Sequence, residues 1–235
     1  MEGASGVVQL DLAKRSVREV NLFLHRELPL LPPPRRVEVL DPAGMHNVAV
    51  GLDADAEVHV RGHVGYYVAG MNKQASITVH GNAGRGAAEN IMSGVVRIEG
   101  NASDMAAASG RGGLVVIAGD AASRCAISLK GADVVVGGSV GHASAFMAQR
   151  GRLVVLGDAG PGLGDSLYEA VIYVCGKVHG LGADAREEEF TRADREAVAG
   201  LLAAAGLDAD LGGFKRVAGA RTLYHWNAAH SGHYG

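Results

Sequence analysis

The chain has 235 residues, of which 35 are glycine, and its 22 basic and 25 acidic residues leave a formal net charge of -3. This length is enough to bury a substantial core, and a nearly balanced charge without a long basic run argues against nucleic acid as a partner. Because the glycines lack a three-residue period, their abundance indicates a turn-rich fold rather than collagen.

The first predicted element is an amphipathic helix near the N-terminus. Apolar residues recur at helical spacing among charged ones from Leu12 to Leu28, and the prolines at 32–34 end this pattern. We assign residues 1–36 to an N-terminal helical extension that caps or tethers the domain that follows.

The middle of the chain repeats with a period of 19 residues. Seven glycines mark the repeat, and we expect them to be structural corners: Gly62, Gly81, Gly100, Gly119, Gly138, Gly157 and Gly176. Valine, isoleucine or leucine stands two and four residues before each glycine, which predicts a short strand with one buried face. Such a period is typical of a solenoid, in which each repeat buries its apolar face by stacking on its neighbours.

We predict an all-β fold, a right-handed single-stranded parallel β-helix with about seven 19-residue coils over residues 37–180, flanked by short N- and C-terminal helices. Right-handed winding is the default for parallel crossovers. The polar residue after each glycine, such as Asn82 or Asn101, is expected to turn a corner in the left-handed region. Small residues seven positions after each glycine, such as Ala107 and Ala126, are expected to allow close backbone approach.

The region after the repeats, residues 181–235, is predicted to hold a helix and a docking tail. Three glutamates at 187–189 precede apolar residues at helical spacing, which predicts a helix near 187–204. The aromatic and basic tail from Phe214 to Trp226 is either a strap on the solenoid or a docking peptide.

One outer face of the predicted solenoid changes character along the stack. The outward column of the strands is polar in the first coils and apolar in the later ones, and a contiguous apolar column at a surface indicates a cover. The cover is the chain's own helix near 187–204, a partner protein, or both of them on adjoining strips. The candidate interface residues are Val116, Val135, Val154, Tyr173, Leu156, Tyr66, Tyr67, Lys73 and Trp226.

No set of residues in the sequence forms a complete active site. The unbroken period leaves no room for the long insertions that build the groove of a catalytic β-helix. The histidines His59, His63, His80 and His142 occupy different columns, and we expect them to be structural. We therefore predict no catalytic residue, no metal ligand and no cofactor bound by this chain.

A column of basic residues has two interpretations. Lys73, Arg111 and Lys130 each stand eleven residues after a repeat glycine. They form either a solvated polar corner or a basic strip that faces an anionic ligand or an acidic partner.

The cysteines and the N-terminus bear on the compartment. Cys125 and Cys175 fall at different phases of the repeat, so we expect buried free thiols rather than a disulfide. No apolar run approaches the length of a membrane span, and Met1 to Leu10 lacks a secretory signal pattern. We expect a cytoplasmic protein with no membrane contact.

Several segments carry a family resemblance. They are the Gly-x-x-Gly corners that begin at Gly62, Gly81, Gly138 and Gly157, the stretch 145–157, the runs 62–75 and 88–94, and the tail segment 214–216. The coil pattern over roughly residues 37–180 resembles the GXGXG domain, the β-helix found in the glutamate synthase large subunit and in one of the subunits of formylmethanofuran dehydrogenase. The runs 62–75 and 88–94 look like the stand-alone GXGXG subunit of N-methylglutamate synthase (methylamine-glutamate N-methyltransferase), and that match would span nearly the whole chain.

This resemblance implies a complex of three chains. The other two would be a class II glutamine amidotransferase-like subunit and an FMN-binding, iron–sulfur-containing glutamate synthase-like subunit, with the present chain as a non-catalytic scaffold between them. The implied reaction converts glutamate and methylamine to N-methylglutamate and ammonia. The alternatives are the GXGXG subunit of a formylmethanofuran dehydrogenase-type complex and an independent β-helix enzyme.

Overall fold

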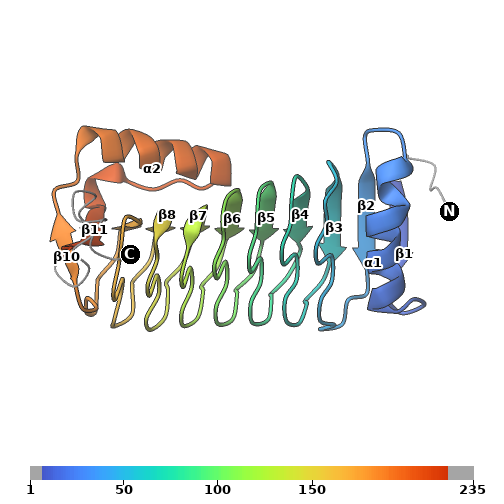
Figure 1. Ribbon diagram of the computed structural model, residues 1–235, viewed down its shortest axis with the longest axis horizontal. Coiled ribbons are helices and arrows are strands. Elements are labelled where there is room, and N and C mark those ends of the chain that lie inside the picture. The colour runs from blue at the N-terminus through green and yellow to red at the C-terminus, as the bar shows by residue number, and fades with distance from the viewer. Residues whose placement is uncertain (1–6, 222–235) are drawn as a thin grey trace, which may run out of the picture.

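The computed structural model describes residues 7–221, which form a solenoid of stacked coils with a helix at one end, two strands at the other and a second helix lying over the later strands of the sheet (Figure 1). In chain order the elements are β1 (Val7–Asp11), α1 (Val17–Arg26), a 3-10 turn (Leu28–Leu30), β2 (Arg36–Leu40), β3 (Glu57–Arg61), β4 (Ser76–Val79), β5 (Val95–Ile98), β6 (Leu114–Ile117), β7 (Lys130–Val136), β8 (Arg150–Val155), β9 (Val171–Val174), β10 (Ala185–Glu188), α2 (Arg192–Ala205), a second 3-10 turn (Leu211–Gly213) and β11 (Lys215–Gly219).

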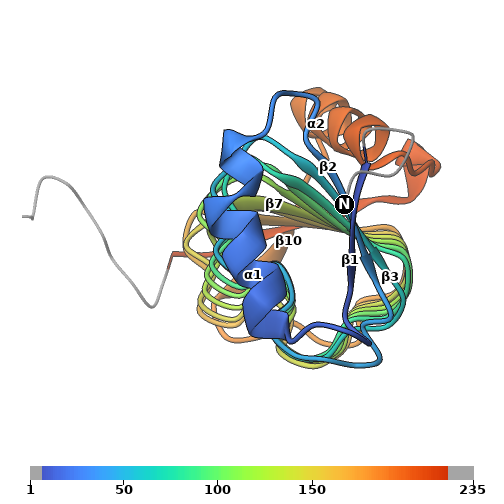
Figure 2. The same cartoon turned by 90° about the vertical axis from the view of Figure 1, so that its right-hand side faces the viewer.

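The described strands form one sheet that runs the length of the solenoid. Strands β1 to β9 pair in parallel in chain order. The repeat sets the register, because Val58 pairs with Ile77 and Val96 with Val115, each 19 residues apart. Along the axis the coils superimpose, with the strands as one wall and turns as the rest of each coil (Figure 2). The predicted parallel β-helix is confirmed.

The repeat positions require glycine because a side chain would have no room there, and not because the backbone adopts a conformation that only glycine favours. A Cβ on Gly119 would collide with Asn101 Oδ1 of the preceding coil and would lie 3.0 Å from the carbonyl oxygen of Gly100. Of the seven repeat glycines, all within the described residues, Gly62 alone has a positive φ, 141°. The column is glycine because two neighbouring coils leave no volume for a side chain.

The polar residues after these glycines do not adopt the left-handed conformation that we expected. Instead, their side chains accept hydrogen bonds from the backbone of the next coil. The backbone N–H of Asn101 donates to Asn82 Oδ1 at 2.8 Å, and that of Asp120 donates to Asn101 Oδ1 at 2.8 Å. The same bond continues through Ser139 and Asp158 as far as Lys177. We call this column the polar ladder.

The left-handed residues lie in the turn segment on another side of the coil. In one coil Met105, Ala107 and Ser109 have φ values of 62°, 58° and 56°. The alanine column that contains Ala107 and Ala126 is fully buried, as the predicted close approach requires. Each alternate residue of the segment is left-handed, which keeps this side of the coil tight.

Helix α1 covers the N-terminal end of the stack. Asn21 Nδ2 donates to the carbonyl oxygen of Asn47 at 2.7 Å, and Asn21 Oδ1 accepts from the backbone N–H of Ala49 at 2.9 Å. One turn further along α1, His25 Nε2 lies 2.7 Å from the carbonyl oxygen of Val50. In the next coil, the backbone N–H of Ala69 donates to the carbonyl oxygen of Val48 in the coil before it, at 3.0 Å. The side chains of α1 therefore supply the partners that a preceding coil would supply.

Strands β1 and β11 are features that the sequence pattern did not reveal. β1 lies within the range 1–36 that we assigned to a helical extension, yet it pairs in parallel with β2. β11 lies antiparallel between β9 and β10, so the described part of the tail is a strap on the solenoid. Trp226 lies outside the described residues.

Helix α2 confirms the predicted C-terminal helix but begins later than expected. Glu187 and Glu188 belong to β10 instead of the first helical turn. The helix begins after Thr191, which forms a capping box with Asp194, and it ends at Gly206 with φ 61°. The acidic residue in the first turn, where the positive end of the helix dipole favours a negative charge, is therefore Asp194.

Candidate interaction surfaces

The apolar strip on the outer face of the sheet is covered by the chain itself. Val116, Val135 and Val154 are fully buried, and Tyr173 is 3% exposed. These residues of β6 to β9 pack against the inner face of α2, which contributes Val198, Leu201, Leu202 and Ala205, and against Phe214. Figure 1 shows α2 lying over this part of the sheet. The chain's own helix therefore covers these four side chains, and they are not available to a partner protein.

Leu156 stands at the margin of this strip. It is half-buried and packs against the same cluster between the sheet and α2. Only its exposed part could contact another chain.

Both ends of α2 are fixed by polar contacts. At its C-terminal end, the Arg97 guanidinium donates to the carbonyl oxygen of Ala205. At its N-terminal end, Tyr173 Oη donates to Asp194 Oδ1 at 2.7 Å, and Arg216 Nε donates to the same oxygen at 3.1 Å. Burial alone would raise the pKa of Asp194, but the hydrogen bonds from Thr191, Tyr173 and Arg216 outweigh it and lower the pKa to about 2. The Asp194 cluster therefore connects α2 to β9 and β11.

The uncovered half of the sheet face carries a charged network. Arg61 Nη2 donates to Glu38 Oε1 at 2.6 Å, and His80 Nδ1 lies 2.8 Å from Glu99 Oε2. His59 Nδ1 lies 2.8 Å from His80 Nε2, with the two rings stacked at 5.1 Å. His59 and His80 stand in different columns of the repeat, and the structure brings them together because adjacent columns of neighbouring strands meet on one face.

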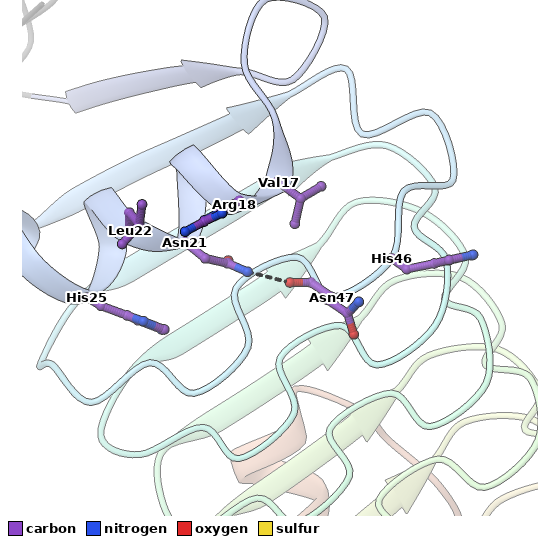
Figure 3. Close-up of a pocket in the computed structure, with 7 residues that line it drawn as sticks. All are labelled: Val17, Arg18, Asn21, Leu22, His25, His46 and Asn47. Carbon is purple, nitrogen blue, oxygen red and sulfur yellow. Dashed lines mark hydrogen bonds between the residues drawn. The ribbon is translucent and has the colours of Figure 1, made fainter.

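An open groove of about 450 Å³ lies between α1 and the first coil (Figure 3). Arg18 and Leu22 line the α1 side, and His46 lines the opposite side. The His46 ring stacks on Tyr66 with centroids 4.4 Å apart, and its Nδ1 accepts the backbone N–H of Tyr66 at 2.9 Å. Tyr66 is 57% exposed and Leu22 is 38% exposed. Among the candidate interface residues in the described part of the chain, Tyr66 is the most exposed aromatic side chain, and it stacks on a residue that lines this groove.

Tyr67 and Lys73 are engaged by the chain's own carboxylates. A hydrogen bond to Glu89, aided by burial, raises the pKa of the Tyr67 hydroxyl. Lys73 Nζ forms an ion pair with Asp53 Oδ2 at 3.0 Å. The basic column that we expected to begin at Lys73 is thus neutralised there.

Further along the stack, an additional basic residue lies beside the predicted basic column. Lys130 of β7 pairs in the sheet with Arg150 of β8. Arg150 belongs to this corner although it follows the repeat glycine by twelve residues instead of eleven.

The remaining chemistry-bearing residues give no further site within the described part of the chain. Both cysteines are free, and burial raises the pKa of the Cys125 thiol to about 12. Among residues 7–221, no three His, Cys, Asp or Glu side chains gather closely enough to share a metal ion. Within the same residues, no helix has both the length and the apolar character needed to cross a membrane.

The fold and its surfaces define a parallel β-helix protein with a strip covered by its own helix and an open groove beside α1. The chain is 52% identical to Protein GlxC of Rhizobium meliloti (strain 1021) over 219 residues, which is 93% of this chain and 96% of that protein. The chain therefore belongs to the GlxC family. No protein-family model and no solved structure matches it.

Proposed function

We propose that the chain is a non-catalytic scaffold subunit of a glutamate synthase-like complex. The single observation that carries this proposal is the rigid stack from β2 to β9, whose two ends are closed by the chain's own elements. With about 4.8 Å between neighbouring strands, that stack is about 34 Å long. A body of this kind can hold two other proteins at a fixed distance and orientation.

The reaction that we propose for the complex is that of N-methylglutamate synthase. Glutamate would exchange its amino group for methylamine, giving N-methylglutamate and ammonia. The proposed partners are a class II glutamine amidotransferase-like subunit and an FMN-binding subunit with an iron–sulfur centre. This part rests on the resemblance of the runs 62–75 and 88–94 to the GXGXG subunit of that enzyme, since the name of GlxC states no activity.

The test is to purify the tagged chain from its native cells, record an absorption spectrum and identify the accompanying chains by mass spectrometry. We expect flavin absorption and both proposed partner chains, together with methylamine-dependent formation of N-methylglutamate from glutamate. Molybdenum, tungsten or zinc enzymes in place of a flavoprotein would favour the formylmethanofuran alternative. A colourless chain that purifies alone would overturn the proposal.

A further inference from the structure

We infer that the groove beside α1 binds a short acidic segment of a partner protein, with Arg18 pairing its carboxylates and Leu22 contacting an apolar side chain. This inference rests on the proposed function for the existence of a partner. It goes further in naming the surface that the partner uses and the chemistry that the surface recognises.

The charge of the groove is complementary to a carboxylate. Among its lining residues Arg18 carries a positive charge, and none is an aspartate or glutamate. Arg18 is exposed, and it makes no ion pair or hydrogen bond to any residue in the described range 7–221. A cation without a partner in a concave site attracts an anionic group and opposes a basic one.

Apolar surface borders the same groove. Leu22 lines it and is 38% exposed, and Tyr66, which is 57% exposed, stacks on the lining residue His46. The segment that follows Tyr66 is held against the first coil by two backbone bonds, from the N–H of Asn47 to the carbonyl of Tyr66 at 2.8 Å and from the N–H of Gly51 to that of Gly70 at 2.7 Å. One exposed leucine is ordinary, but a leucine and an aromatic ring exposed at one groove indicate a docking surface.

The groove is already formed and has room for a short peptide. From Val17 to His25, α1 rises about 12 Å, a length that about four residues of extended chain would span. Asn21 and His25 fix α1 to the first coil by three hydrogen bonds. Both walls are thus positioned before a partner arrives, which lowers the entropy cost of binding.

A photo-crosslinking experiment tests where the partner docks. The photoreactive residue p-benzoylphenylalanine replaces Leu22 in the full-length chain in its native cells, and Leu30, which is 82% exposed on the first 3-10 turn, carries it in the control. We expect the Leu22 position to crosslink to a segment rich in aspartate or glutamate in a co-purifying protein, and the Leu30 position not to. Crosslinks to a second copy of this chain, or to a segment without acidic residues, would overturn the inference.

A charge-reversal pair tests the chemistry of the contact. Arg18→Glu is compared with Arg26→Glu, which makes the same charge change at an exposed position of α1 outside the groove lining. With the purified partner, we expect Arg18→Glu to raise Kd at least about tenfold, or about 1.4 kcal/mol, and Arg26→Glu to change it little. Equal effects of the two variants would overturn this inference alone, whereas the absence of any co-purifying protein would overturn both proposals.

Discussion

Replacement of Asp194 by asparagine is expected to loosen α2 from the sheet. The Asp194 side chain is 11% exposed and accepts hydrogen bonds from Thr191, Tyr173 and Arg216. The folded pKa of about 2, against an ordinary value of 3.8, corresponds to about 2 kcal/mol of stability at neutral pH. Asp194→Asn removes this charge while nearly preserving the shape of the side chain, so we expect a loss of about 2 kcal/mol at pH 7.

The sign of the pH dependence follows from the lowered pKa. Because the folded state holds the Asp194 proton less tightly than the unfolded state, the stabilisation is complete above about pH 5 and is lost as the pH falls towards 2. The difference between the wild-type chain and Asp194→Asn should therefore be largest near neutral pH, roughly halve by pH 3 and nearly disappear at pH 2.

Hydrogen exchange of the α2 amides at pH 7 and urea unfolding over a pH series measure this effect. We expect α2 to exchange roughly thirty-fold faster in Asp194→Asn, as a loss of about 2 kcal/mol would produce. Asp208→Asn is the matched control, because Asp208 is exposed and makes no hydrogen bond within the described chain. Equal exchange in the two variants, or a stability difference that does not change with pH, would refute the reasoning.

Three further substitutions test the packing. Val135→Lys buries an ammonium group between the sheet and α2, so urea unfolding should show a loss of at least about 2 kcal/mol; unchanged stability would mean that α2 does not cover this position. Ala126→Leu overfills a fully buried site with φ 58°, and we expect a loss of about 1–3 kcal/mol, whereas a normal melting curve would show that this column faces outward. Gly119→Ala should cost about 1–3 kcal/mol through its collision with Asn101. Adding Asn101→Ala should recover part of that loss in a double-mutant cycle, and strictly additive losses would contradict the ladder explanation.

The regular part of the fold could be predicted because it depends on residues that repeat. Val58, Ile77 and Val96 recur at one phase, and a parallel pairing 19 residues apart satisfies all of them at once. The covered strip was also visible, since an apolar outward column requires a cover. Its identity became clear only from the packing of α2 against Val135 and Val154.

The parts that could not be predicted depend on single contacts between distant segments. β1 and β11 belong to no repeat, so only their pairing with β2 and β9 reveals them as part of the sheet. Thr191 and Asp194 have the spacing of a capping box, a signal that would have placed the start of α2 correctly. The groove offered no such signal, because it arises from the position of α1 against the first coil.

The polar ladder restricts how the length of this protein can change in evolution. Each ladder residue accepts from its counterpart 19 positions later, so removing or adding one whole coil leaves every remaining bond intact. An insertion of any other length within a coil would bring the wrong residue to the ladder and shift the strand register on one side of it. The distance between the two ends can therefore be adjusted only in steps of about 4.8 Å, as on a ruler with fixed graduations.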